Sequence, residues 1–163
     1  MPNIDDWIRT FSSTKRKIRV RAANVLLDRA AFVPLDVLIA ILKEFSSEGL
    51  GARTEKALSQ CRDPERVSSV IELLETKDSF VRQVACAVLG QFGDRRATPH
   101  LLRMLDDPEM MVRRAAGFAL AVLKDPSCVS ELREQYDRHQ NDNTNVLMAI
   151  QCALKSLGEN VDA

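Results

Sequence analysis

One amphipathic pattern recurs along this chain at a nearly fixed spacing. Between residues 78 and 94, apolar side chains stand at positions i, i+4, i+7, i+8 and i+11, which form the buried stripe of a helix with 3.6 residues per turn. These residues are Val81, Ala85, Val88, Leu89 and Phe92. Copies of the pattern begin at Ile18, Leu50, Val112 and Val146, so the period is close to 31 residues. A repeat of this length predicts stacked pairs of helices, because a single pair cannot bury its apolar side alone.

The predicted fold is all-α: an α-solenoid of about five two-helix repeats, coiled as a right-handed superhelix. Each repeat holds an A helix and an antiparallel B helix, and the repeats cover residues 4–30, 34–60, 64–93, 96–124 and 126–158. Asp78 is placed to cap a B helix, and Gly93 is placed to end it. We therefore predict a single repeat domain over residues 1–158 and a disordered tail over residues 159–163.

Charge and hydropathy limit the class of protein. The 163 residues include 23 Lys and Arg and 23 Asp and Glu, so the net charge does not favour binding to nucleic acid or an anionic membrane. No apolar run approaches the ~20 residues of a membrane span, and the N-terminus carries acids where a signal peptide carries bases. We expect a cytoplasmic protein. The four cysteines form no CxxC pair, so the sequence predicts no metal site and no cofactor.

Residues 94–125 resemble the HEAT-like repeat first described in phycobilin lyases. The matching positions are Pro99, Leu101, Leu102, Asp107, Pro108, Val112, Arg113, Ala115, Ala116, Ala119 and Leu120. The resemblance implies a curved solenoid whose B helices line the concave side. It also implies that the Arg of the family's Val-Arg pair, which aligns with Arg19, Arg82 and Arg113, bonds to neighbouring turns. Most such proteins are adaptors, with some chromophore lyases and a few enzymes, so the resemblance is more specific for fold than for function.

Large apolar residues stand outside the buried stripe of the later B helices. If those helices line an inner face, these residues are exposed, and Phe and Met in such positions favour a binding surface. The predicted partner-binding residues are Phe80, Gln83, Val84, Met111, Arg114, Ala115, Phe118 and Met148. An alternative is that Phe80 and Met111 pack against the next repeat as ordinary core.

The first two B helices are basic instead. The residues predicted to contact an acidic partner are Lys17, Arg21, Arg53 and Lys56. The alternative is a solvated face with no ligand, because charge runs on helices usually serve solubility. Phosphate of nucleic acid is a weaker interpretation, since the basic residues stop after Lys56 and the whole chain is neutral.

Three functions compete at this point. We expect a non-catalytic scaffold or adaptor that binds another protein on the inner face of the B helices. A second copy of the chain is an alternative occupant of that face. The alternative is a bilin lyase-like or chaperone-like subunit of an enzyme complex, and nucleic-acid binding comes third. The HEAT-like iron hydroxylase of deoxyhypusine uses His-Glu pairs as ligands, but neither His100 nor His139 is followed by Glu. The sequence therefore predicts no catalytic residue.

Overall fold

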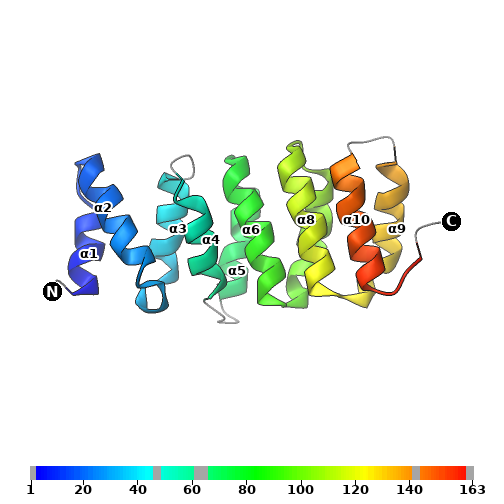
Figure 1. Ribbon diagram of the computed structural model, residues 1–163, viewed down its shortest axis with the longest axis horizontal. Helices are drawn as coiled ribbons and strands as arrows, with labels where there is room; N and C mark the ends of the chain where they lie inside the picture. The colour runs from blue at the N-terminus through cyan, green and yellow to red at the C-terminus, as the bar shows by residue number, and fades with distance from the viewer. Residues whose placement is uncertain (1–2, 46–48, 61–65, 141–143, 161–163) are drawn as a thin grey trace. The chain divides into compact units, whose positions relative to one another are not determined.

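The structure is a computed structural model that describes residues 3–45, 49–60, 66–140 and 144–160. These residues form ten α-helices and five short 3₁₀ helices, and they contain no β-strand (Figure 1). The predicted all-α class is confirmed. The helices gather into two compact units, Met1–Arg62 and Asp63–Ala163, and each unit is described by itself. One continuous domain over residues 1–158 stays a prediction.

The first unit holds two helix pairs. They are α1 (Ile4–Phe11) with α2 (Arg16–Leu27), and α3 (Leu35–Glu44) with α4 (Gly51–Ser59); η1 (Ala30–Phe32) joins the pairs. The Asn3 side chain accepts from the N–H of Ile4, and the Asp6 carboxylate accepts from the N–H of Asn3, so a capping box begins α1. The Phe11 and Phe45 rings meet edge to face, with centroids 6.1 Å apart. This aromatic pair joins the first helix pair to the second.

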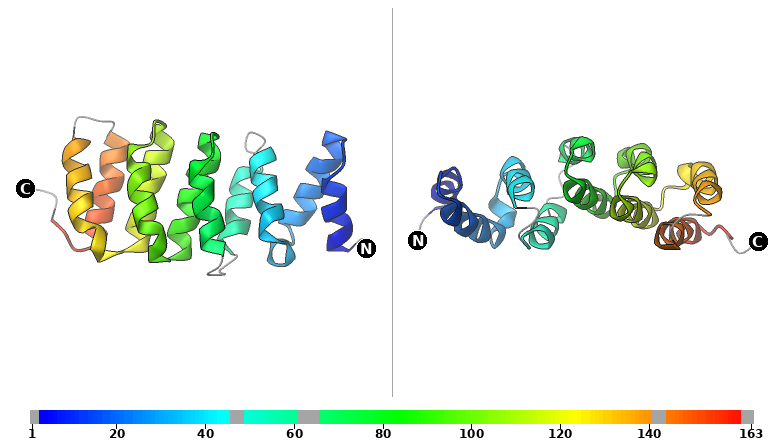
Figure 2. Two further views of the ribbon diagram at one scale, coloured as in Figure 1. Left: turned by 180° about the vertical axis from the view of Figure 1, so that it is seen from behind. Right: turned by 90° about the horizontal axis from the view of Figure 1, so that it is seen from above.

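The second unit repeats the same arrangement three times. Its A helices are α5 (Arg66–Ile71), α7 (Thr98–Arg103) and α9 (Val129–Arg138), and its B helices are α6 (Ser79–Phe92), α8 (Met110–Leu123) and α10 (Thr144–Ser156). Short 3₁₀ helices lie between them: η2 (Glu72–Glu75), η3 (Arg95–Ala97), η4 (Met104–Asp106) and η5 (Pro126–Cys128). Seen from above, α5, α7 and α9 form one layer of this unit and α6, α8 and α10 the other (Figure 2). The apolar stripes of the two layers face each other and form its core.

Helix ends in the second unit follow the predicted turn chemistry. The Asp78 carboxylate accepts hydrogen bonds from the N–H groups of Phe80 at 2.9 Å and Val81 at 3.4 Å, which caps α6. Gly93 ends α6 with φ of 70°, a left-handed conformation that glycine adopts without strain. One repeat later, α8 ends in the same conformation at Lys124, where φ is 50°. The left-handed helix end is therefore repeated in α8 although no glycine occupies the position there.

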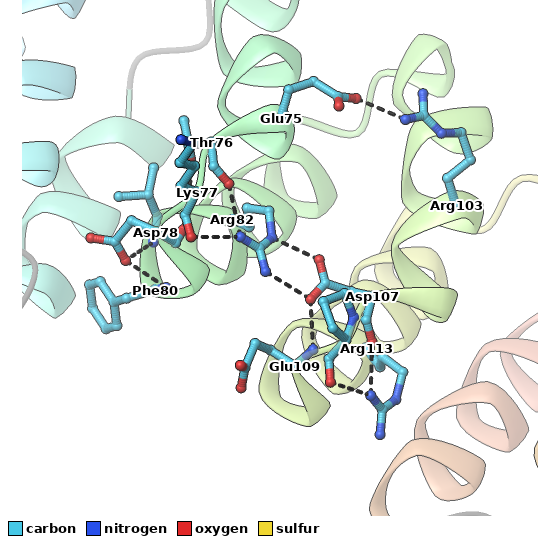
Figure 3. A network of polar contacts seen from close by, with 12 residues as sticks. Glu75, Thr76, Lys77, Asp78, Phe80, Arg82, Arg103, Asp107, Glu109 and Arg113 are labelled. Atoms are coloured by element: carbon cyan, nitrogen blue, oxygen red, sulfur yellow. Dashed lines mark hydrogen bonds and ion pairs between the residues drawn. The ribbon is translucent and has the colours of Figure 1, made fainter.

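Arg82, whose side chain is 11% exposed, ties successive turns of the second unit together (Figure 3). Arg82 donates to the backbone carbonyls of Thr76 at 2.8 Å and Lys77 at 3.2 Å. Its other nitrogens donate to both carboxylate oxygens of Asp107, at 2.7 and 3.0 Å. Burial opposes ionisation of Asp107, but hydrogen bonds from Arg82 and the Glu109 N–H outweigh it and hold the pKa of Asp107 below its ordinary value. The arginine thus links the turn before its own helix to the turn before the next one.

Arg19 and Arg113 make the same backbone contacts in their own repeats. Each donates to the carbonyls six and five residues before it: Ser13, Thr14, Asp107 and Pro108. Arg19 also pairs with Glu44. Glu44 follows Arg19 by 25 residues, as Asp107 follows Arg82, so the two carboxylates hold equivalent positions in the repeats. The ladder role implied by the resemblance is confirmed at all three arginines.

Two glycines bring the B helices of the second unit close together. A Cβ placed on Gly90 of α6 would lie 2.7 Å from the Cα of Ala119 in α8. A Cβ on Gly117 of α8 would lie 2.7 Å from the Cβ of Ala149 in α10. Neither position has space for a side chain, so the glycines set the spacing at which α6, α8 and α10 lie side by side.

Some predictions about the ends of the chain need revision. Glu159 was expected to begin a disordered tail, but it pairs with Arg133, and its N–H donates to the carbonyl of Leu154 at 3.1 Å. Residues 161–163 lie outside the described residues, as do Cys61 and the start of the predicted repeat 64–93. Among the helices that are described, none has both the length and the hydrophobicity of a membrane-spanning segment.

Candidate partner-binding face

An apolar strip runs along the side of α8 that faces away from its buried stripe. Met111, Ala115, Phe118 and Val122 stand at i, i+4, i+7 and i+11, so helical geometry places them on one side of α8. Met148 of α10 is also exposed, and we call these five residues the apolar strip. The exposed fractions are 39% for Met111, 40% for Phe118, 61% for Val122 and 48% for Met148. These side chains are large and apolar, yet the chain leaves them in contact with solvent.

The strip resolves one alternative that the sequence left open. Met111 is exposed, so it is not core, whereas Phe80 of α6 is half-buried and belongs to the edge of the face. Gln83, Arg114 and Ala115 are also half-buried, in the zone between exposed and packed surface. The predicted face therefore has its apolar centre on α8, and its half-buried margin includes Phe80 and Gln83 of α6 and Arg114 of α8.

Val84 does not belong to this face, and its predicted exposure is wrong. Its side chain is only 2% exposed. It lies three residues after Val81 and four before Val88, so it is next to both of these buried residues on the surface of α6. Val122, four residues after Phe118 on the same side of α8, was not among the predicted binding residues, and the structure adds it to the exposed apolar surface.

The thiols of the second unit differ in their environment. Burial raises the pKa of Cys86 to about 12, and burial raises the pKa of Cys128 to about 11. Cys152 of α10 is exposed and lies one turn after Met148, beside the apolar strip. Because the thiolate is the reactive form, the two buried cysteines act as small apolar side chains rather than nucleophiles.

The basic residues of the first unit do not all behave alike. Lys17, Arg21 and Lys56 are exposed, in agreement with their predicted availability. Arg53 is half-buried and donates to the Asn24 side chain, to the Asn24 carbonyl at 3.2 Å and to Asp28 at 2.6 Å. Its guanidinium is already engaged within the unit, so Arg53 is a ladder residue of the second repeat rather than a free contact.

The buried polar groups of the second unit make local contacts. Within the described parts of the chain, no three His, Cys, Asp or Glu side chains converge as metal ligands would. His139 is buried, and its ring nitrogen lies 3.6 Å from a carboxylate oxygen of Asp106. Asp125 accepts from the buried hydroxyl of Thr98 at 2.7 Å, and this hydrogen bond lowers its pKa. These polar groups serve helix caps and packing.

Comparison with known proteins agrees with this architecture. Residues 35–119 match the family described as HEAT repeats, which is more than half of the chain. The chain belongs to the HEAT-repeat family. Residues 112–137 of this HEAT-repeat protein also match the PBS lyase HEAT-like repeat, and that segment includes most of α8. The resemblance found in the sequence is confirmed.

This HEAT-repeat protein covers only part of the length of the proteins that it resembles. It is 37% identical over 75 residues to deoxyhypusine hydroxylase of Bos taurus, a match that covers 45% of this chain and 24% of that enzyme. Among solved structures, the CpcE–CpcF complex of phycocyanin lyase from Nostoc sp. PCC7120 matches with a TM-score of 0.69 at 21% identity. That match covers 96% of this chain and 65% of the other. An engineered protein matches with a TM-score of 0.60 at 18% identity, covering 96% of this chain and 80% of its own. Likeness at this identity shows the fold alone.

Proposed function

We propose that this HEAT-repeat protein is a non-catalytic subunit of a protein complex and holds its protein partner on the apolar strip. The exposure of Met111, Phe118, Val122 and Met148 carries the proposal. Stable binding energy in such surfaces comes from a few large apolar anchors, and methionine adapts to the shape of its partner. Arg114 and Gln83 at the margin supply polar groups that orient the partner.

Two kinds of protein could bind a partner in this way, a lyase-like or chaperone-like subunit and a free-standing adaptor. The comparisons support the first of them better. A lyase-like or chaperone-like subunit is favoured by the match of residues 112–137 to the PBS lyase HEAT-like repeat. The likeness to a lyase that consists of two associated proteins supports the same kind of protein. A free-standing adaptor is the second candidate, because the strip needs no chromophore to bind a protein. Both kinds of protein require a partner on the same residues.

The test is a pull-down from nuclease-treated lysate of the source cells with matched variants. Phe118→Glu places a charge at the centre of the strip, whereas Phe32→Glu places the same charge on an exposed phenylalanine of the first unit. Both side chains are exposed, so both variants are expected to keep the wild-type circular dichroism. The wild type and Phe32→Glu should retain a common partner that Phe118→Glu loses. If Phe118→Glu and Phe118→Glu/Met148→Glu both keep every partner, the strip is not the binding surface.

A second measurement separates the two kinds of protein. A free bilin is titrated into the purified protein, and its absorbance spectrum is followed. A saturable spectral change in the wild type that Phe118→Glu abolishes would support a lyase-like subunit. An unchanged spectrum together with a partner lost on Phe118→Glu would support a plain adaptor. DNA binding that is sub-micromolar and sensitive to salt would instead favour the nucleic-acid alternative.

A further inference from the structure

The first unit contains a pocket that the proposed function does not use. It has a volume of about 410 Å³ and is lined by Trp7, Thr10, Lys17, Ile18 and Arg21, from α1 and α2. Pockets of this size lie within the range that takes a ligand or an anchoring side chain. Trp7 and Ile18 give the pocket its apolar surface, and Ile18 is 38% exposed. The two cations lie one helical turn apart on α2.

The repeat register shows what kind of element such a surface accepts. Ile18 and Arg21 of α2 occupy the positions of Val112 and Ala115 in α8. In α8 the side that carries Val112 packs against the preceding B helix, since the backbone of Ala119 lies against Gly90 of α6. Val112 is completely buried there, whereas Ile18 at the same position is open. The pocket therefore lies on the side of a B helix that is shaped to receive another helix.

Charge distinguishes this surface from its counterpart on α8. Lys17 and Arg21 are exposed, and no ion pair to either occurs among the residues that the structure describes. Arg19, between them in sequence, is already paired with Glu44. The nearby Asp6 of α1 lies 3.4 Å from Arg9 and accepts the Asn3 N–H, so it is engaged on its own helix. The pocket thus combines an apolar surface with two available positive charges.

We propose that this pocket binds an acidic amphipathic helix of a partner protein, distinct from the partner on the apolar strip. The apolar side of that helix would pack on Trp7 and Ile18, and its carboxylates would pair with Lys17 and Arg21. A second copy of the chain stacked end to end fits less well. In the register of α8, the side of α10 that would continue the stack carries the cation Lys155 and not a carboxylate to face Lys17 and Arg21.

Trp7 makes the proposal directly measurable. It is the single tryptophan of the chain, so its fluorescence reports on the pocket alone. The probe is a capped synthetic helix with a leucine stripe flanked by glutamates at i, i+4 spacing. Its titration should shift the Trp7 emission to shorter wavelength and saturate. Peptides with Gln or Lys in place of the glutamates should bind more weakly in that order, and added salt should weaken the glutamate peptide.

Matched charge reversals test the residues. Lys17→Glu/Arg21→Glu should weaken binding of the glutamate peptide by at least about tenfold, because attraction becomes repulsion. Lys43→Glu/Lys77→Glu reverses two other exposed lysines and should leave the affinity unchanged. Should the double reversal lower the helical content, Lys17→Gln/Arg21→Gln replaces it, with a smaller expected loss.

Three outcomes would overturn the proposal. One is the absence of any saturable Trp7 shift with the glutamate peptide. Another is equal affinity for the glutamate and lysine peptides, which would make the pocket merely apolar. The last is a Trp7 shift that follows protein concentration without peptide, accompanied by a dimer in sedimentation, since a second copy would then be the occupant.

Discussion

The buried pair of Arg82 and Asp107 offers the sharpest test of how the second unit is held together. The side chain of Arg82 is 11% exposed and that of Asp107 is 4% exposed, and two hydrogen bonds join them. Asp107→Asn removes the charge and keeps the size of the side chain. Removing one partner of a buried ion pair costs about 3–5 kcal/mol, because the other charge stays buried. Arg82 keeps two carbonyl partners, so we expect a loss of about 3 kcal/mol in the free energy of unfolding.

The control is an ion pair of the same unit that lies in solvent. Arg103 and Glu75 are 2.9 Å apart, with side chains 61% and 64% exposed (Figure 3). Exposed pairs contribute about 0.2–1 kcal/mol, so Arg103→Ala should lower the free energy of unfolding by no more than that. Urea unfolding followed by circular dichroism measures both variants. A loss for Asp107→Asn no larger than that for Arg103→Ala would refute the reasoning.

The same pair predicts a pH dependence. The pKa of Asp107 is lower in the folded protein than in the unfolded chain, so the unfolded chain takes up this proton first as pH falls. The advantage of wild type over Asp107→Asn should be full above about pH 4, the ordinary pKa of an aspartate, and should shrink as pH falls toward the folded pKa. A constant difference between pH 7 and pH 2 would contradict the assigned charge.

Three further predictions concern packing, backbone and thiols. Gly117→Ala should cost about 1–3 kcal/mol of unfolding free energy by overpacking against Ala149, and a double-mutant cycle with Ala149→Gly should show coupling. Lys124→Gly should raise the unfolding free energy by up to about 1 kcal/mol, because it relieves a left-handed backbone; urea unfolding would show no gain if the strain is absent. At pH 8, Cys152 should react with a maleimide within minutes while Cys86 reacts only in denaturant, as read by peptide mass spectrometry; equal rates would contradict the burial of Cys86.

Much of the fold could be predicted from local pattern. The apolar period placed the B helices, and Asp78 and Gly93 marked the two ends of α6 where the structure has them. These features depend on a residue and its near neighbours. A cap needs only an oxygen two or three residues away, and glycine adopts a left-handed turn without strain because it has no Cβ. The ladder arginines belong partly to this class, because their carbonyl acceptors lie five and six residues before them.

The proposed partner-binding surface was predictable only in outline. The sequence placed Met111, Phe118 and Met148 outside the buried stripe, and the structure leaves them exposed. It could not show that Val84, next to Val81 and Val88 on α6, is buried. Exposure at such positions depends on how closely the next helix approaches, and that distance is set by contacts such as Gly117 against Ala149.

What the sequence by itself determined was the class of fold, the repeat length and the placing of charge and apolar surface along each helix. Only the tertiary structure decided which charges are free. Arg53 and Arg21 look alike in sequence, yet Arg53 is engaged by Asn24 and Asp28 while Arg21 lines an apolar pocket beside Trp7. The physical reason is that a cation's availability depends on carboxylates and carbonyls brought near it by packing. The helical period specifies which side of a helix a residue occupies, but not which neighbour lies against it.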